Sequence, residues 1–508
     1  MRRFAITAAL VCLVGQLSAQ NINQSVQVTN EYETKFADFQ KQGMEMSVPD
    51  SLYEFDYDFD YSVFETPYKG SYEFSPYMIK MTPEARAYDG KKLYLRAGAG
   101  YSLHPVLDFV YTPLDRKNLN LSIFNEGKGY SGSSFYDFED SFGAGGRLIL
   151  KNNTLKYKAG YDGIFAGSGS SGSSYNSLYA EAGLASAAHA ENYLHYDLGL
   201  KYRYAADKYS VSNAGQHLVR LGGNVGPVID GGLGFLMDFS FDVLSGAANM
   251  AQFTPKFTYT WGVFDFSAGV RLDYMDLSSN KLSVAPAVKA SADLLGGMMK
   301  AELGAVGGRN LNDYHSLKTL NHFYTAATMT PMASREKINA YLALKGHVGS
   351  AVQYAVKGGY SVASSVAMDA MYGIGFADLS KAYVGADVKW VSERIELDAL
   401  VNYAYNVVSG SSSVFVPSAL TADVRFTYNW LRRIYAGASL DFASVRKSMG
   451  TADDIPAYAD LALLGEWRMN SKWSVWAKAG NLLGMSIQRV PGYVEKGPYL
   501  TVGIGLSL

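Results

Sequence analysis

The sequence predicts an all-β fold, a transmembrane antiparallel β-barrel of about 20 to 22 strands. We expect a short, irregular N-terminal segment before it, in the periplasm or in the lumen. Apolar and polar residues alternate along most of the chain, several alternating runs reach ten or more residues, and no long apolar run follows the N-terminus. A membrane-crossing strand needs about 9 to 11 tilted residues, whereas strands of soluble sheets typically have about five or six. Strand length therefore favours a barrel in a membrane over a soluble sandwich.

The segment from Leu194 to Tyr204 shows the alternation clearly. Leu200 and its apolar neighbours lie on one face, whereas Asp197 and Arg203 lie on the other. Such a strand presents apolar side chains to lipid and ionic side chains to the lumen. Similar alternation occurs in residues 93–100, 155–162, 264–274, 382–390, 395–405, 434–442 and 473–479.

The composition agrees with this fold class. The 508 residues include 38 Tyr and 51 Gly but only 14 Pro, and charged residues are 18%. The mean hydropathy is -0.05, as expected where polar lumen residues offset apolar lipid-facing ones. The sequence contains no basic patch of the kind that would indicate binding to nucleic acid.

The first 19 residues are predicted to be a signal peptide. Arg2 and Arg3 precede an apolar stretch from Phe4 to Val14, and Ala19 then offers a small residue for cleavage. The apolar stretch is too short to span a bilayer. Cys12 is the only cysteine, so a mature chain that starts at Gln20 has no thiol for disulfides, nucleophilic catalysis or metal binding.

Residues 20–90 form a predicted N-terminal segment that is acidic, aromatic and irregular. Within it, aromatic side chains alternate with carboxylates over nine positions. These positions are Tyr53, Glu54, Phe55, Asp56, Tyr57, Asp58, Phe59, Asp60 and Tyr61. Calcium sites gather carboxylates around a bend that often contains Gly, and this stretch has no such bend. We expect these nine residues to contact a protein partner or the lumen.

The connections within residues 91–508 predict the orientation of the barrel, because outer-membrane barrels have short periplasmic turns and longer external loops. Short links are predicted at 151–154, 262, 295–297, 347–350, 392–394, 430–432 and 470–472. Longer links are predicted at 126–140, 167–176, 307–334, 364–380, 406–417, 446–456 and 481–497. An even number of strands places both termini in the periplasm.

No catalytic, cofactor-binding or metal-binding constellation is predicted, so we do not expect an enzyme. The seven histidines show no metal-ligand spacing, and His315 and His322 lie in a polar link without further ligands nearby. The glycine-rich run 167–172 lacks the Lys-Ser/Thr ending of a phosphate-binding loop. Aromatic residues near predicted strand ends fit an interfacial girdle instead. They include Tyr202, Tyr204, Trp261, Tyr274, Trp390, Tyr403, Tyr405 and Trp473.

The last 28 residues carry the most specific motif. Asn481-Leu482-Leu483-Gly484 is followed by Pro491-Gly492-Tyr493 and by an alternating strand that ends at Leu508. This arrangement resembles the C-terminal end of TonB-dependent outer-membrane receptors of the Bacteroidota type. The segment Gly308-Arg309-Asn310, before a long loop, resembles the middle of the same barrel. The closing strand is a predicted assembly strand, recognised by the barrel assembly machinery, with Tyr499, Leu500, Val502, Ile504, Leu506 and Leu508 as its signal residues.

The chain departs from that family in two respects. The family usually ends in an aromatic residue, whereas Leu508 is aliphatic, and residues 20–90 are too few for the family's globular plug. The resemblance therefore implies a plugless receptor-like barrel in the cell outer membrane, surrounded by its lipids. We expect a subunit or scaffold of an envelope complex with a periplasmic or outer-membrane protein partner. The alternative is a transporter or porin for a small solute. A lumen this wide must be filled, and the candidates are residues 20–90, the links 307–334 and 364–380, or a partner.

Overall fold

A computed structural model describes the part of the chain that follows the N-terminal segment. The described residues are 92–116, 118–169, 171–186, 194–209, 212–227, 233–245, 248–276, 280–325, 332–371, 373–410 and 413–508. The predicted signal peptide and the nine residues 53–61 lie outside this range.

Twenty-two antiparallel strands form one sheet, and each strand pairs with its neighbour in the chain. A separate two-stranded hairpin, β22 and β23, lies in the last loop. The strands are β1 (Leu93–Tyr101), β2 (Val106–Arg116), β3 (Leu119–Ser131), β4 (Tyr136–Ile149), β5 (Asn153–Ser168), β6 (Ser171–Ser186), β7 (Leu194–Tyr209), β8 (Ser212–Pro227), β9 (Leu233–Leu244), β10 (Ala248–Trp261), β11 (Phe264–Met275), β12 (Leu282–Leu294), β13 (Met299–Asn312), β14 (Met332–Val348), β15 (Val352–Ala370), β16 (Gly373–Val391), β17 (Ile395–Ser409), β18 (Leu420–Trp430), β19 (Ile434–Ala443), β20 (Tyr458–Arg468), β21 (Trp473–Gly480), β22 (Ile487–Val490), β23 (Tyr493–Glu495) and β24 (Tyr499–Ser507).

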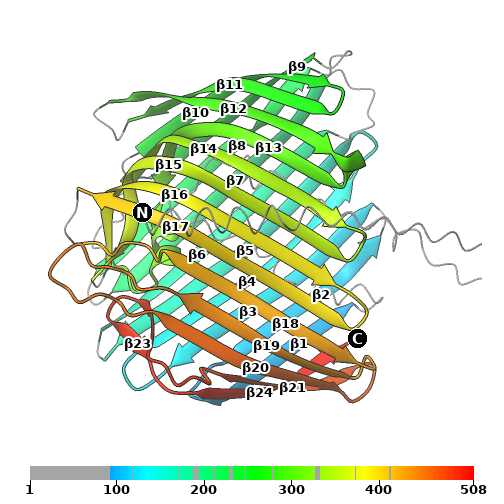
Figure 1. Ribbon diagram of the computed structural model, residues 1–508, viewed down its shortest axis with the longest axis vertical. Helices are drawn as coiled ribbons and strands as arrows, with labels where there is room; N and C mark the ends of the chain where they lie inside the picture. Colours follow the sequence, from blue (N-terminus) through cyan, green and yellow to red (C-terminus); the bar gives the residue numbers. More distant parts are fainter. Residues whose placement is uncertain are drawn as a thin grey trace, which may run out of the picture. The chain divides into compact units, whose positions relative to one another are not determined.

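The sheet closes into a barrel because its first and last strands pair. The register between β1 and β24 runs from Tyr94 opposite Ser507 to Tyr101 opposite Leu500, and the tilted strands follow one another around the ring (Figure 1). A closed sheet satisfies the backbone hydrogen bonds that an open edge would leave unpaired in lipid. The predicted fold class and the upper end of the predicted strand range are confirmed.

The predicted inside and outside faces are also confirmed. On β7, Leu200 is 49% exposed, whereas Arg203 on the other face is 6% exposed and points into the barrel. On β24, Leu500, Val502 and Ile504 are each about half exposed and Thr501 is buried. Hence apolar side chains cover the exterior and ionic side chains line the lumen. The role of β24 as an assembly signal stays a prediction.

The end of the barrel that is predicted to face the periplasm, called here the periplasmic end, is built from tight turns and a tryptophan belt. β10 and β11 are joined by two residues, and Gly262 takes a positive φ of 60° there. Five of the six tryptophans lie on strands next to these turns, where aromatic rings suit the boundary between lipid and water. They are Trp261, Trp390, Trp430, Trp467 and Trp473.

The external end differs from the prediction at several links. The predicted link 364–380 is wrong, because β15 continues to Ala370 and β16 begins at Gly373. The links 126–140 and 167–176 are likewise mostly strand, interrupted only between Ser131 and Tyr136 and between Ser168 and Ser171. The loop within 307–334 is shorter than predicted, because β13 extends to Asn312.

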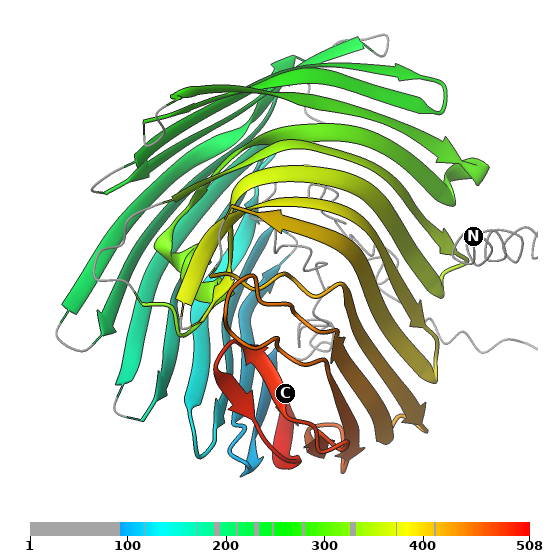
Figure 2. The same ribbon diagram turned by 60° about the vertical axis from the view of Figure 1, so that its left-hand side comes forward.

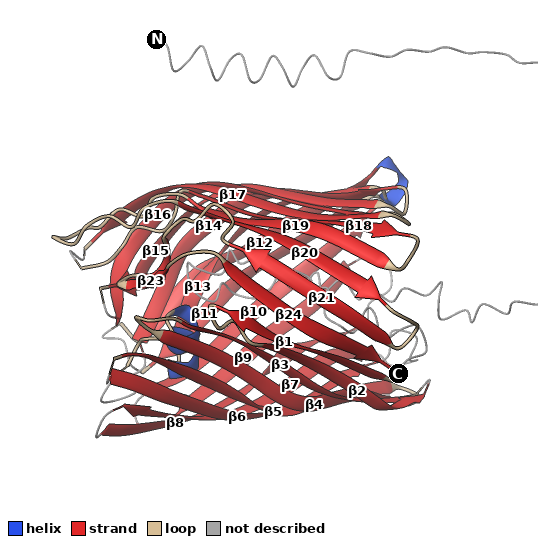
Figure 3. Cartoon of the chain, turned by 90° about the horizontal axis from the view of Figure 1, so that it is seen from below, coloured by secondary structure: helices blue, strands red, loops and turns tan. Residues whose placement is uncertain are grey.

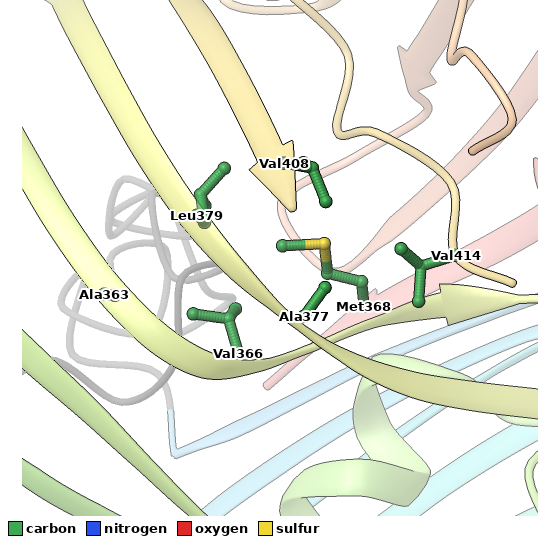
Figure 4. Packing of buried hydrophobic residues seen from close by; sticks show 7 residues of the cluster. All are labelled: Ala363, Val366, Met368, Ala377, Leu379, Val408 and Val414. Atoms are coloured by element: carbon green, nitrogen blue, oxygen red, sulfur yellow. The ribbon is translucent and has the colours of Figure 1, made fainter. Parts of the chain in front are cut away.

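These long strands persist because side chains near their external ends pack against apolar partners from neighbouring strands. Val366 and Met368 of β15 pack against Leu379 of β16, Val408 of β17 and Val414 (Figure 4). Polar composition alone indicated loops here, and the packing of these side chains favours strand instead.

One seven-residue helix, α3 (Tyr314–Leu320), follows β13, and a 3-10 turn, η3 (Leu295–Gly297), joins β12 to β13. Within the described ranges, no helix has both the length and the apolar character needed to cross a bilayer. Helix α3 lies inside the ring of strands (Figure 2).

Candidate functional site in the lumen and its external cap

The loop between β13 and β14 folds into the barrel mouth rather than away from it. Its helix α3 contacts the wall formed by β6, β7 and β8 (Figure 3). The backbone N–H of Tyr314 donates to Gln216 Oε1 of β8 at 3.0 Å, and the Tyr314 hydroxyl donates to Asp207 of β7 at 2.6 Å. The start of the loop is therefore fixed to one side of the lumen.

Lys318 anchors the same helix with a fully buried ammonium group. Its Nζ donates to Ser173 Oγ of β6 at 2.6 Å and to the Tyr324 carbonyl at 2.8 Å, and lies 3.3 Å from Asp207. Burial lowers the pKa of Lys318, and the Asp207 carboxylate opposes that shift. A buried ammonium without such partners would be strongly destabilising.

His315 is held between two wall residues. Its Nδ1 lies 2.9 Å from the Tyr175 hydroxyl and 3.1 Å from Nη1 of Arg203. A guanidinium can only donate, so Nδ1 accepts and the ring is neutral. Burial, together with the Arg203 charge, lowers the pKa of His315 to about 4.

The end of the loop reaches other strands. His322 Nδ1 lies 2.8 Å from Asp137 of β4, and Asn321 donates to Asp369 Oδ1 of β15 at 3.1 Å. Phe323 stacks on Tyr493 of β23 with ring centroids 3.4 Å apart. The loop therefore crosses the mouth from one part of the wall to another, as expected for one of the segments predicted to fill the lumen.

Asp369 joins this loop to the β17–β18 and β19–β20 loops. Its Oδ2 accepts from Arg446 Nη1 at 2.9 Å, and its carbonyl accepts from the Phe415 N–H at 2.9 Å. Arg446 also donates to the Arg489 carbonyl at 2.7 Å. Breaking these contacts would leave buried charges without partners, which carries a large free-energy cost.

Asn481, from the motif at the C-terminus, fixes the last external loop. It has a positive φ of 47°, its N–H donates to Asp460 at 2.8 Å, and its Nδ2 donates to the Met485 and Gly497 carbonyls. The side chain thus ties the two ends of the loop together. We call residues 313–325, 413–419, 444–457 and 481–498 the external cap.

A cavity of about 690 Å³ lies in the lumen beside β1–β4 and β17–β24. Eleven carboxylates line it, compared with five lysines and arginines. The carboxylates belong to Asp108, Glu126, Asp137, Glu139, Glu396, Asp398, Asp423, Asp441, Asp460, Glu466 and Glu495. This acidic cavity attracts cations and repels anions.

Strands β12 to β16 carry charge of the opposite sign. Lys289, Lys345, Lys357 and Lys381 face the lumen there, and we call these four residues the lysine wall. Glu302 lies 3.3 Å from Lys289 and 3.7 Å from Lys345. The Lys357 ammonium lies 4.3 Å from the centroid of the Tyr341 ring. Glu302 and the buried Glu336 lie on the same strands and partly balance the charge of these lysines.

The Gly308-Arg309-Asn310 motif forms a bulge in β13. The register with β14 shifts between Val306 and Gly308, and Gly308 has a φ of 144°. A Cβ at Gly308 would collide with the Arg271 guanidinium, which donates to the Arg309 carbonyl at 2.6 Å. Asp273 accepts from the Arg309 N–H at 2.7 Å. The motif is thus structural, and only glycine fits its centre.

The sequence did not identify the residues that hold the cap. His315 and His322 show no ligand spacing in the sequence, whereas both contact the wall. Lys318 and Asp369 carried no signal, because a lone charge in a polar link looks the same whether it is buried or solvated. Among the described residues, no group of three or more His, Cys, Asp or Glu is arranged to hold a metal ion.

The closed barrel has the fold of solved outer-membrane receptors, and the resemblance to the barrel of TonB-dependent receptors is confirmed as a resemblance in fold. No family model and no curated protein matches the chain. Solved structures do match, with 7 to 12% identity among those compared, which shows the fold alone. The ferric enterobactin receptor PfeA of Pseudomonas aeruginosa is 11% identical with a TM-score of 0.59, covering 82% of this chain and 81% of the receptor.

Two further receptors give the same result. The ferric-catecholate import receptor Fiu of E. coli K12 is 8% identical with a TM-score of 0.58, covering 82% of both chains. The siderophore receptor PirA of Acinetobacter baumannii is 10% identical with a TM-score of 0.58, covering 82% of this chain and 80% of that receptor. These neighbours are transport receptors rather than enzymes. The chain is accordingly an outer-membrane protein with a receptor-like barrel.

Proposed function

We propose that this barrel is a closed subunit or scaffold of an outer-membrane complex. The observation that carries the proposal is the external cap, whose β13–β14 loop is fixed across the mouth through Lys318 on one side and Asp369 on the other. A porin needs an open mouth, and a cap held by buried charges opposes opening. In this function the barrel supports other subunits, and no solute passes through its lumen.

The energetics support a permanent closure. Breaking a buried charged pair by removing one partner typically costs about 3 to 5 kcal/mol, and the cap has at least two such pairs, Lys318 with Asp207 and Arg446 with Asp369. A solute that opened the cap would have to bind the open form more tightly by a comparable free energy. A small solute makes few contacts from which to gain that much.

The alternative is a transporter for a small cationic solute. The acidic cavity favours it, because eleven carboxylates against five cationic side chains lower the energy of a cation in the lumen. In that case the cap acts as a gate. The solved structures with this fold include a protein described as the copper transporter OprC, 12% identical over 82% of this chain with a TM-score of 0.54.

Two measurements on the full-length mature protein separate these functions. A scaffold gives no steady current in planar lipid bilayers and co-purifies from native membranes with a partner in fixed stoichiometry. Large, steady, cation-selective currents without a stoichiometric partner would overturn the scaffold and support the transporter.

We also infer that the barrel assembly machinery recognises β24 through its lipid-facing residues. Until β24 pairs with β1, its backbone groups remain free to form a sheet with another protein. Replacing Ile504 and Leu506 with Ser should lower the amount of assembled barrel in the outer membrane. The matched control replaces Val475 of β21 and Ala438 of β19 with Ser. Equal losses in both variants would contradict a specific role for β24.

A further inference from the structure

We propose that the turn between β18 and β19 is a docking point for an acidic protein at the periplasmic end of the barrel. The turn consists of Leu431, Arg432 and Arg433. The proposal rests on the proposed scaffold function, because it names the surface that holds a partner and the chemistry of that partner. Backbone strain, exposure and charge in this turn support it.

The turn has a backbone conformation that its residues disfavour. The Arg433 N–H donates to the Trp430 carbonyl at 3.1 Å, which closes a β-turn of four residues. Its two central residues have positive φ angles, 54° at Leu431 and 56° at Arg432. Asn and Gly adopt such angles readily in hairpin turns, whereas a bulky side chain there costs free energy. Strain of this kind gathers at functional sites.

The exposure of Leu431 gives that strain no return within the barrel. Its side chain is 81% exposed at the tip of the turn, so it contributes little packing to the strands. Burying an exposed leucine against a partner is favourable, because it removes apolar surface from water. A partner with an apolar pocket therefore accounts for a leucine at this strained position.

The turns on either side add positive charge. Arg394 belongs to the β16–β17 turn and Lys472 to the β20–β21 turn, and with Arg432 and Arg433 they make four exposed cationic side chains that we call the basic rim. Glu393 is the only acidic side chain in these three turns. Within the described ranges, no ion pair neutralises any member of the basic rim. Carboxylates on a partner would complement this charge.

The docking surface is fixed before a partner binds. Asn429 connects two of the turns, because its Nδ2 donates to the Glu393 carbonyl at 3.3 Å and its Oδ1 accepts from the Arg432 N–H at 2.8 Å. The Asn429 N–H also donates to the Arg394 carbonyl at 2.7 Å. A preorganised surface loses little conformational entropy on binding, which favours affinity.

The position of the cations favours a protein over the lipid surface. Ile395 and Ile434 pair with Tyr428 and Trp430 on the lipid-facing side of the sheet. Arg394 and Arg433 each precede one of these isoleucines, and alternation therefore places both arginines on the lumen side of the ring. Phospholipid headgroups lie outside the ring, whereas a protein docked at the periplasmic opening lies over it.

An Asn-Gly turn in the full mature protein tests the proposal. The variant Leu431→Asn with Arg432→Gly relieves the strain and removes the exposed leucine and one cation. The temperature at which heat unfolding changes the gel mobility of the barrel should rise by about 2 to 4 °C. The amount of partner that co-purifies from native membranes should fall by about tenfold or more. A rise in stability without a loss of partner would overturn the proposal.

A second strained turn supplies the matched control. Leu295 in η3 has a φ of 52° and is 67% exposed, but residues 295–298 carry no charge. Leu295→Asn should also raise the unfolding temperature, and it should leave the amount of co-purified partner unchanged. Equal losses of partner in the two variants would contradict a docking point at the β18–β19 turn.

A photo-reactive side chain identifies what lies against the turn. Leu431 is replaced by p-benzoyl-phenylalanine, which keeps an apolar group at the tip, and intact cells are irradiated. Mass spectrometry is expected to find position 431 joined to one protein, at a segment rich in Asp and Glu. Adducts with phospholipid alone, or no adducts, would overturn the proposal.

The scaffold function can fail separately from the docking turn. A wild-type barrel that conducts ions in bilayers and has no stoichiometric partner overturns both. A barrel that has a stoichiometric partner and keeps it in the Asn-Gly variant overturns only the docking turn.

Discussion

The two ends of the barrel are built in different ways. At the periplasmic end, strands are joined by links such as Gly262-Val263, and a tryptophan belt marks the membrane boundary. At the external end, buried charged groups join the four loops of the external cap. Asp369 of β15 contacts Asn321 and Arg446, which belong to two of these loops, and Lys318 joins the β13–β14 loop to the wall. A barrel needs only short turns for closure of the sheet. Under the proposed scaffold function, the additional contacts at the external end close the mouth.

The largest expected effect comes from removing the central carboxylate of the cap. Asp369→Ala removes the ion pair with Arg446 and one of the two acceptors of the Asn321 amide, whose other acceptor is the Gly373 carbonyl. We expect the cap to open more readily by about 3 kcal/mol, which is roughly a hundredfold faster amide exchange in residues 313–325. Hydrogen exchange with mass spectrometry measures it. The control Asp453→Ala changes an exposed carboxylate in the same cap, and similar exchange in both variants would refute the central role of Asp369.

A second variant tests whether the buried ammonium is equally important. Lys318→Met keeps much of the side-chain volume but leaves Asp207 with only the Tyr314 hydroxyl as its partner. We expect faster exchange in α3 by about 2 kcal/mol, with β12–β13 and the other periplasmic turns unchanged. The double variant with Asp207→Asn should recover part of the loss. An additive loss in the double variant would mean that the two groups do not interact.

The bulge in β13 allows a test that concerns the wall rather than the cap. Gly308→Ala places a Cβ against Arg271 at a φ of 144°. We expect a loss of about 2 kcal/mol in the stability of the barrel. The measurement is the change in gel mobility that accompanies heat unfolding of the barrel, and the temperature at its midpoint should fall. Gly465→Ala is the matched control, because a Cβ there meets nothing within 4 Å. An equal fall of the unfolding temperature in both variants would contradict a special requirement for glycine at position 308.

Acid should loosen the cap before it affects the strands. The pKa of His315 is lowered to about 4 in the folded protein from 6.5, so a released loop binds a proton more readily than a docked one. The contribution of neutral His315 is complete above about pH 6.5 and is lost as the pH falls towards 4. Exchange in α3, corrected for the intrinsic exchange rate at each pH, should rise over this range. In His315→Gln the additional rise should disappear, and an unchanged pH profile would show that His315 is not responsible.

The smallest effect is expected at the periplasmic end. Gly262→Ala strains a turn with a positive φ of 60° in open space, which costs about 1 kcal/mol. Hydrogen exchange should rise in β10 and β11 next to the turn, with no change in the external cap. A change in the cap would show that the two ends are coupled.

Much of the barrel could be predicted from sequence because its physical causes are local. Alternation sets the faces of strands such as Leu194–Tyr209, and short polar links identify the periplasmic turns. The external end could not be predicted in the same way. Val366 and Met368 lie within a link that reads as polar, yet they pack against Val408 of another hairpin. Lys318 and Asp207 lie far apart in the sequence, and their pairing depends on the closed ring.

The most direct test of the closed mouth is a cysteine pair across it. Residues 20–508 contain no cysteine, so Phe323→Cys and Tyr493→Cys can form one disulfide between two external loops, where the native Phe323 and Tyr493 rings stack with centroids 3.4 Å apart. We predict rapid formation in intact cells upon mild oxidation, and no disulfide in the control pair Phe323→Cys with Asp453→Cys. Thiols that stay reduced in the first pair and react freely with an external reagent would contradict a closed external cap.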